Sequence, residues 1–171
     1  MKPKRIVLIG FMGSGKSSVG RIVAERLGWD FVDTDAFVEA RAGARIAEIF
    51  RTSGEATFRE WESRVIGELV ARTRIVVATG GGAPTQPSLR SFFAGQDSTV
   101  VHLRVSLADA LQRTGNHAGR PLLSQSEDAI RALYQGRQAI YEELGMPVET
   151  DGKTPLETAE QIMLLLGNPS H

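Results

Sequence analysis

The stretch Gly10-Phe11-Met12-Gly13-Ser14-Gly15-Lys16-Ser17 matches the pattern G-x-x-x-x-G-K-[ST]. A short apolar run, residues 6–9, precedes it, and an amphipathic segment begins near Lys16. Glycines allow a backbone to curl around a polyphosphate, so that N–H groups and a helix N-terminus face the anion. The sequence therefore predicts a phosphate-binding loop between a strand and a helix, in a protein that binds a nucleoside triphosphate.

The last two residues of this phosphate loop, residues 10–17, have separate expected tasks. Lys16 supplies a mobile positive charge for the β- and γ-phosphates, and the Ser17 hydroxyl can ligate the Mg²⁺ that accompanies the nucleotide. The alternative is a glycine-rich turn that merely precedes a helix. Average residue usage makes that coincidence rare, so nucleotide binding with Mg²⁺ is the favoured interpretation.

The composition limits the classes of protein to consider. The chain has 171 residues, of which 42% are hydrophobic and 23% are charged, as in an ordinary globular domain. Its 20 basic and 20 acidic residues cancel, so the overall charge favours neither nucleic acid nor an anionic membrane as a partner. We expect one domain over residues 1–171, with any anion site formed locally.

Cysteine is absent, which excludes disulfides, thiolate metal sites and a cysteine nucleophile. This composition suits a reducing compartment, and we expect a cytoplasmic protein. The N-terminal apolar run ends at Gly10 and is too short for a signal peptide or a membrane span. Because nothing in the sequence indicates a large apolar interface, we expect a monomer.

Apolar runs with strand character alternate along the chain with segments of helical periodicity. The runs lie near residues 5–10, 30–34, 74–79, 98–105 and 147–150. This alternation predicts a parallel sheet with helices on both faces, which is a three-layer α/β/α fold. Three helical segments are expected to pack on this core through apolar stripes: Val19, Ile22, Val23 and Leu27; Trp61, Val65, Leu69 and Val70; and Leu156, Ala159, Ile162, Met163 and Leu166.

Two segments interrupt the alternation. Residues 33–73 contain a long insertion, helical from about residue 36, which is either a simple crossover or a subdomain that holds a substrate. Residues 115–125 contain two glycines and a proline, and this composition predicts a mobile lid loop.

Asp33-Thr34-Asp35 lies at the end of the second predicted strand. In an extended chain the two carboxylates point to the same side, toward the crevice where open α/β sheets bind ligands. One carboxylate could hold Mg²⁺ through water, and the other could accept a hydroxyl proton from an acceptor substrate. The alternative is that one of them only caps the following helix.

Arg59 and Glu62 lie three residues apart on the insertion, on neighbouring faces of a predicted helix. An arginine there can clamp a carboxylate, with Glu62 orienting it. A plain ion pair on the protein surface is the other interpretation of this spacing.

Gly80-Gly81-Gly82 follows the third predicted strand and leaves its exit without any Cβ atom. A small ligand could then lie directly against backbone N–H groups at the edge of the sheet. A flexible turn is the alternative, and it is the less favoured one beside a phosphate loop.

Arg113, Arg120 and Arg137 lie in the lid loop or in the helices that flank it. Phosphoryl transfer needs positive charge around the γ-phosphate, which arginines on a closing lid can supply. We favour Arg120, because Gly119 and Pro121 flank it inside the loop.

The three histidines form no metal-ligand spacing. His102 lies on an apolar strand and is expected to be a core residue. His117 lies in the lid loop, where it could touch nucleotide, and His171 is terminal.

In order and spacing, these motifs resemble the shikimate kinase family over nearly the whole chain. The resemblance is carried by Gly10-x-Met12-Gly13-x-Gly15-Lys16-Ser17, Asp33-Thr34-Asp35, Phe58-Arg59-x-x-Glu62, Gly80-Gly81-Gly82, Arg120-Pro121-Leu122 and Arg137-x-x-x-Tyr141. It implies ATP-dependent phosphorylation of the 3-hydroxyl of shikimate, a step of the chorismate pathway to aromatic amino acids. It also implies a P-loop NTPase fold like that of nucleoside monophosphate kinases, with five parallel strands ordered 2-3-1-4-5.

The resemblance further implies roles for individual residues. The catalytic residues would be Asp35, Lys16 and Arg120, with Asp35 as candidate base. The nucleotide would contact Gly13, Ser14, Gly15, Lys16, Ser17, Ser18, Arg113, Arg120 and Lys153. Shikimate would contact Asp35, Arg59, Glu62, Gly80, Gly81, Gly82 and Arg137, beside an aromatic wall that includes Phe50 and Phe58. Mg²⁺ would be held by Ser17 and Asp33.

Two features depart from the family pattern. Lys153 stands in an adenine-side loop where the family often has an arginine, so a cation is kept without a planar group. The lid stretch 116–119 is less basic than the family pattern suggests, which leaves Arg120 as the expected lid contact.

Three other interpretations were weighed. A gluconate kinase or another small-metabolite kinase shares the phosphate loop and lid, but should lack the combined aspartates, Arg59 and triple glycine. A GTPase switch should carry N-K-x-D, which the chain lacks. An inactive relative is expected to have lost Lys16, Asp35 or Arg137, and all three are present.

Overall fold

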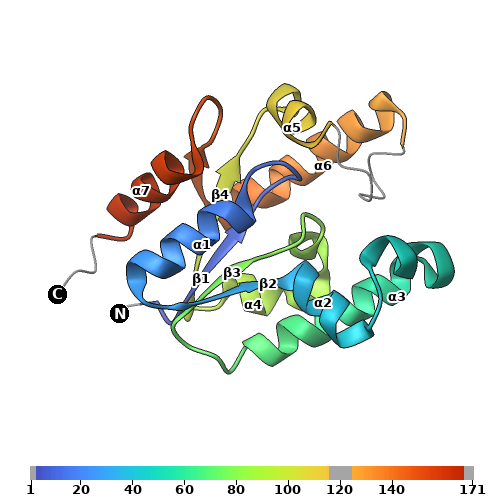
Figure 1. Ribbon diagram of the computed structural model, residues 1–171, viewed down its shortest axis with the longest axis horizontal. Helices are drawn as coiled ribbons and strands as arrows, with labels where there is room; N and C mark the ends of the chain where they lie inside the picture. The colour runs from blue at the N-terminus through green and yellow to red at the C-terminus, as the bar shows by residue number, and fades with distance from the viewer. Residues whose placement is uncertain (1–2, 116–124, 168–171) are drawn as a thin grey trace.

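The computed structural model describes residues 3–115 and 125–167. Within them, five parallel strands form a sheet in the order β2-β3-β1-β4-β5 (Figure 1). The strands are β1 (Arg5–Ile9), β2 (Asp30–Asp33), β3 (Ile75–Ala78), β4 (Ser98–Arg104) and β5 (Met146–Glu149). The predicted strand positions and the strand order are confirmed.

Helices cover both faces of the sheet, as expected for a three-layer fold (Figure 1). One face carries α1 and α7, and the other carries α3, α4 and α6. The helices are α1 (Lys16–Leu27), α2 (Thr34–Ala42), α3 (Ile46–Leu69), α4 (Arg90–Ala94), α5 (Leu107–Thr114), α6 (Glu127–Leu144) and α7 (Pro155–Leu165), with two 3₁₀ turns, η1 (Ala83–Thr85) and η2 (Pro87–Leu89).

The core has two parts because successive side chains of a strand point to opposite faces. On β1, Ile6 and Leu8 pack with α1 and α7, whereas Val7 and Ile9 pack with the helices of the other face. All four side chains are at most 1% exposed. Near-continuous apolar strands are the expected consequence of covering a sheet on both sides.

Two residues of the predicted apolar stripes lie outside the core. Val70 is 52% exposed, because α3 ends one residue earlier at Leu69. Leu156 is 46% exposed in the first turn of α7. The start of α7 itself is as expected, since Thr154 forms a capping box with Glu157.

The insertion between β2 and β3 folds as two helices, α2 and α3, which pack on each other. The helix α3 is broken at Gly54, whose φ of 83° and ψ of 171° are not helical. Its second half packs Val65, Ile66 and Leu69 into the core. The first half continues outward as the separate turns at the right of Figure 1. This break was not predicted from the sequence.

Candidate active site

The phosphate loop, Asp33 and the glycine segment Gly80–Gly82 follow the carboxyl ends of β1, β2 and β3. They meet in a cleft of about 850 Å³. The cleft is lined by predicted site residues from every motif that the structure describes: Gly13, Ser14, Gly15, Lys16, Ser17, Ser18, Asp33, Asp35, Arg59, Glu62, Gly80, Gly81, Gly82, Arg113, Arg137 and Lys153. The predicted lid residue Arg120 and His117 lie outside the described residues.

Strand order divides this cleft into two sides. The central strand β1 leads to the phosphate loop, β2 and β3 flank it on one side, and β4 and β5 flank it on the other. The aspartates and the glycine segment therefore lie on one side of the loop. The helix α5 and the β5–α7 connection, which carry Arg113 and Lys153, lie on the other.

The phosphate loop has the backbone that its glycines were expected to allow. Gly13 and Gly15 have φ values of 78° and 90°, which residues with a Cβ rarely adopt. The ammonium of Lys16 donates to the carbonyls of Gly10 at 2.7 Å and Phe11 at 3.1 Å, so it lies over its own loop. A positive charge is thus already held where the loop would enclose phosphate.

Asp33 takes the capping role that its sequence allowed, and its second oxygen faces the phosphate loop. Its Oδ1 caps α2 by accepting from the backbone N–H groups of Asp35 at 3.0 Å and Ala36 at 3.2 Å. Its Oδ2 accepts from the Ser17 hydroxyl at 2.5 Å. The cap therefore fixes the carboxylate in the orientation that brings its other oxygen to the phosphate loop.

These oxygens fit the needs of Mg²⁺. A hydroxyl and a carboxylate are hard oxygen ligands, and Mg²⁺ in kinases is bound by one or two such groups together with phosphate and water. Among the described residues, no group of three or more His, Cys, Asp or Glu side chains could hold a metal by itself. Ser17 and Asp33 thus suit an ion that arrives with a nucleotide.

The geometric argument made for Asp35 was wrong, although the residue lies in the cleft. The chain is not extended through residues 33–35, because α2 begins at Thr34. Asp35 instead faces the glycine segment, and its Oδ1 lies 2.8 Å from the point where Gly80 would carry a Cβ. The Thr34 hydroxyl accepts from the Gly80 N–H at 3.2 Å, which holds the ends of β2 and β3 together.

Arg59 and Glu62 are not a surface ion pair. Their side chains are 16% and 1% exposed, and the Arg59 guanidinium donates to Glu62 Oε1 at 2.8 Å. Burial raises the pKa of Glu62 from 4.5 to about 7, although the charge of Arg59 opposes this shift. Arg59 also reaches Glu55 at 3.2 Å, so one guanidinium is held by two carboxylates.

The glycine segment is closely packed and is not a free turn. A Cβ at Gly80 would meet the carboxylates of Asp35 and Glu62, and one at Gly82 would collide with the Arg59 guanidinium. At Gly81 it would lie 3.1 Å from Arg137 Nη1. The three glycines are therefore needed for space, which lets two arginines from α3 and α6 approach the same backbone.

The side of the cleft near β4 and β5 is held together by Arg113. Its guanidinium donates to the carbonyls of Gly13 at 3.1 Å and Thr150 at 2.8 Å, and so joins α5 to the phosphate loop and to the β5–α7 connection. Lys153 lines the same side and donates to Gln161 at 2.8 Å.

Some lining residues were not identified from the sequence. Glu39 and Arg45 reach the cleft from the corner between α2 and α3, where Glu39 accepts from the Ile46 N–H at 3.1 Å. The sequence gives little indication that these two residues line a site, because the turn at Gly43 between them resembles the end of any helix. The expected aromatic wall is present, with the rings of Phe50 and Phe58 5.1 Å apart.

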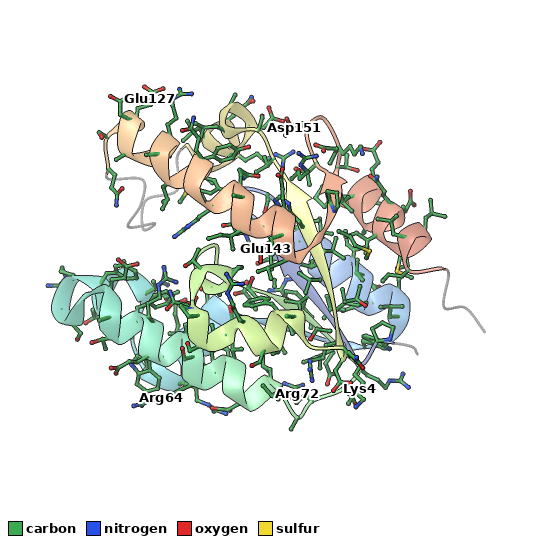
Figure 2. The ribbon with its side chains drawn as sticks, turned by 180° about the vertical axis from the view of Figure 1, so that it is seen from behind. Lys4, Arg64, Arg72, Glu127, Glu143 and Asp151 are labelled. Atoms are coloured by element: carbon green, nitrogen blue, oxygen red, sulfur yellow. The ribbon has the colours of Figure 1, made fainter. Side chains whose placement is uncertain are left out.

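Outside the cleft, the described surface carries charged side chains of both signs, such as Arg64 on α3 and Glu127 and Glu143 near the two ends of α6 (Figure 2). Among the described residues, no helix is long and apolar enough to cross a membrane.

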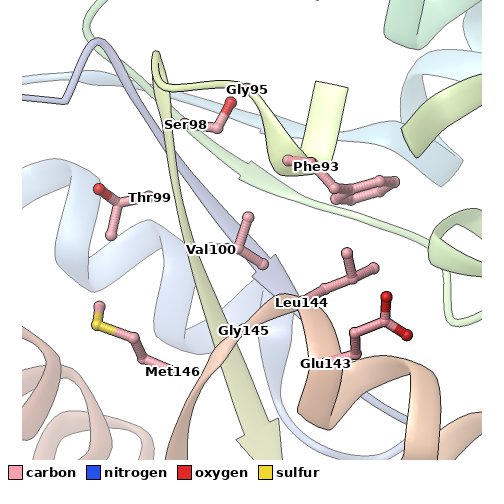
Figure 3. Close-up of a pocket in the computed structure, with 10 residues that line it drawn as sticks. Phe93, Gly95, Ser98, Thr99, Val100, Glu143, Leu144, Gly145 and Met146 are labelled. Atoms are coloured by element: carbon pink, nitrogen blue, oxygen red, sulfur yellow. The ribbon is translucent and has the colours of Figure 1, made fainter. Parts of the chain in front are cut away.

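A second hollow, of about 460 Å³, lies toward the amino ends of β4 and β5 (Figure 3). Its described lining is mostly apolar or small, including Phe93, Val100 and Met146. The charged residue among the lining, Glu143, pairs with Arg90 at 3.3 Å. This hollow lacks the groups that phosphoryl transfer requires.

Fold and site together define a P-loop phosphotransferase. Beside its phosphate loop lies a small, polar pocket, the acceptor pocket, which is formed by Asp35, Arg59, Glu62, Arg137 and residues 80–82. Comparison with known proteins narrows this class. Residues 12–166 match the family model described as shikimate kinase. A shikimate kinase of Halorhodospira halophila is 45% identical, over 98% of this chain and 97% of its own length. The chain therefore belongs to the shikimate kinase family, whose members phosphorylate a hydroxyl group of shikimate.

Solved structures agree with this assignment. Shikimate kinase from Acinetobacter baumannii in complex with shikimate has a TM-score of 0.90 and 40% identity, covering 99% of this chain and 96% of its own. The enzyme from Aquifex aeolicus has a TM-score of 0.84 and 36% identity, covering 95% of each chain. A gluconokinase from Sinorhizobium meliloti, at 23% identity and a TM-score of 0.57, shares the fold.

Proposed function

We propose that the chain transfers the γ-phosphoryl group of ATP to the 3-hydroxyl of shikimate, giving shikimate 3-phosphate in the chorismate pathway. One observation carries the proposal: a phosphate loop shares a cleft with a pocket of two arginines and two carboxylates, built around three glycines. The relative from Acinetobacter baumannii, solved in complex with shikimate, supports the same acceptor.

The acceptor pocket suits a carboxylated, polyhydroxylated ring. Such a ring needs cations for its anion and hydrogen-bonding groups for its hydroxyls. Arg59 and Arg137 are the proposed carboxylate clamp, since both guanidinium groups reach the glycine segment. Glu62 orients Arg59, while Asp35 and the backbone of residues 80–82 are the proposed partners of the hydroxyls.

The donor side is the phosphate loop. Residues 13–18 are proposed to wrap the phosphates with their N–H groups, and Lys16 to neutralise the β- and γ-phosphates. Mg²⁺ held beside Ser17 and Asp33 would supply further positive charge against the transferring group. Arg113 and Lys153 are proposed to contact the adenine side of the nucleotide.

In the proposed reaction, the 3-hydroxyl oxygen forms a bond to the γ-phosphorus while the bond from that phosphorus to ADP breaks. Asp35 aligns the attacking oxygen and takes its proton. The developing charge is met by Lys16 and, as the sequence predicts, by Arg120. Monomeric state and a cytoplasmic location remain predictions from the sequence.

Product analysis tests the site of phosphorylation. Purified protein is incubated with ATP and shikimate, with and without Mg²⁺, and the product is examined by phosphorus–proton correlation NMR. We expect coupling of the new phosphorus to the proton on C3, and no product when EDTA removes the metal. Phosphorylation at another hydroxyl, or an undiminished reaction in EDTA, would contradict the proposal.

A further inference from the structure

Tyr141 is a buried polar side chain that the proposed reaction does not use. It lies on α6, one turn after Arg137, and is fully buried. Its hydroxyl is protonated at neutral pH and can donate a hydrogen bond, and burial raises its pKa further, to about 12.

The Tyr141 hydroxyl joins two parts of the acceptor pocket. It donates to the carbonyl of Gly81 at 2.5 Å, across 60 residues of sequence. The Arg137 guanidinium approaches the same glycine from the preceding turn of the helix: Arg137 Nη1 and the Tyr141 hydroxyl lie 3.1 Å and 3.3 Å from the point where Gly81 would carry a Cβ. The hydroxyl therefore binds a backbone group of the glycine segment at the point where an arginine of the proposed clamp approaches it.

This hydrogen bond also orients the backbone that faces the cleft. The peptide between Gly81 and Gly82 is trans, so its N–H points away from its C=O. Because Tyr141 binds the C=O, the N–H of Gly82 is turned away from α6. The contact thus fixes the orientation of the peptide that the Arg137 guanidinium approaches.

His102 supports the tyrosine ring from β4. The two rings are 5.2 Å apart, and His102 is fully buried, as expected from its sequence position. Burial, reinforced by the charge of Arg104, lowers the pKa of His102 to about 4. His102 is therefore uncharged at neutral pH and fills space behind Tyr141 without opposing the charge of Arg137.

We propose that Tyr141 is a positioning residue for the acceptor: its hydroxyl holds the Gly81 peptide beside the Arg137 guanidinium, in the arrangement that receives a carboxylate. The inference rests on the proposed role of Arg137 in binding shikimate. It predicts that loss of one hydroxyl, with the ring kept, weakens acceptor binding and leaves nucleotide binding intact.

The same helix supplies a matched control. Tyr134 also donates its hydroxyl to a backbone carbonyl, that of Val105, at 2.6 Å. Its ring packs against Phe11, and it is not among the nearest neighbours of the would-be Cβ atoms of Gly80, Gly81 and Gly82. Tyr134→Phe and Tyr141→Phe therefore delete the same group and the same kind of bond from one helix, but only Tyr141 contacts the acceptor pocket.

The test is calorimetric titration of shikimate and of ADP into wild type and both variants, with kcat and melting temperature measured alongside. For Tyr141→Phe, we expect the Kd of shikimate to rise about tenfold, the usual consequence of losing a buried hydrogen bond. The Kd of ADP and kcat at saturating shikimate should stay within about twofold of wild type. Tyr134→Phe should lower the melting temperature by a similar amount without changing the Kd of shikimate.

The proposal is overturned if Tyr141→Phe lowers the melting temperature but leaves the Kd of shikimate unchanged. It is equally overturned if both variants weaken shikimate binding to the same extent, which would indicate general loosening of α6. Failure of wild type to bind shikimate at all would be a different result, since it would remove the proposed function itself.

Discussion

Asp35 is the residue that we propose aligns the reacting hydroxyl of shikimate and takes its proton. It lines the cleft beside Gly80, whereas Asp33 is committed to Ser17 and to the α2 cap. We expect Asp35→Asn to lower kcat by about 10²–10⁴-fold, the usual contribution of a general base, while the Kd of ATP stays near that of wild type. Steady-state kinetics and nucleotide titration check both parts. Loss of ATP binding in this variant would indicate a structural role.

Asp33→Asn is the matched control for that variant. Asparagine caps helices as well as aspartate does, so the α2 cap should persist. The charge beside Ser17 is lost, and the Mg²⁺ concentration needed for half-maximal activity should rise. If the two variants show the same change in kcat and in Mg²⁺ requirement, the separate roles proposed for Asp33 and Asp35 are wrong.

Glu62 makes stability depend on pH. Its pKa is raised from 4.5 to about 7 in the folded protein, so the folded state binds its proton more tightly than the unfolded state does. As pH rises from 4.5 to 7 the unfolded carboxyl ionises first, and folding stability falls. We expect this cost to approach about 3 kcal/mol above pH 8.

The measurement compares wild type with Glu62→Gln by urea unfolding at pH 5 and pH 8. The stability of wild type relative to the variant should decrease as pH rises, because glutamine does not titrate. A relative stability that is constant, or that increases with pH, would contradict the assigned pKa.

At the scale of helices, two glycines in open surroundings provide a contrast. At both Gly54 and Gly136, no neighbouring atom lies within 4 Å of the point where a Cβ would be. Their backbones differ, because Gly54 has a φ of 83° and breaks α3, whereas Gly136 lies within α6. We expect Gly54→Ala to cost about 1–3 kcal/mol and Gly136→Ala to add about 0.4–1 kcal/mol of stability. Urea unfolding of both variants checks this, and stabilisation by Gly54→Ala would contradict it.

Elements whose signals are local were predictable from the sequence. The phosphate loop and the strands were predicted because glycine placement and apolar runs report on neighbours along the chain. The break at Gly54 was not, since an isolated glycine inside a helical pattern is usually tolerated. The contact between Tyr141 and Gly81 joins residues 60 apart, and the burial of Glu62 depends on the packing of several elements. Neither leaves a local signal.

At the scale of the whole molecule, strand order explains why one cleft serves two substrates. With β1 in the centre of the sheet, the phosphate loop separates the proposed acceptor side, after β2 and β3, from the proposed nucleotide side, near β4 and β5. In the proposed reaction the transferring group lies between two pockets that different elements build. Variants of Asp35 or Tyr141 should accordingly affect the acceptor side alone.

The central claim is that this cleft phosphorylates shikimate, and a coupled assay of ADP release tests it most directly. Purified protein is given Mg²⁺ and ATP with shikimate, with gluconate, or with no acceptor. We expect shikimate to raise ADP release far above the rate of ATP hydrolysis alone, and gluconate to have no effect. Turnover with gluconate and none with shikimate would contradict the account.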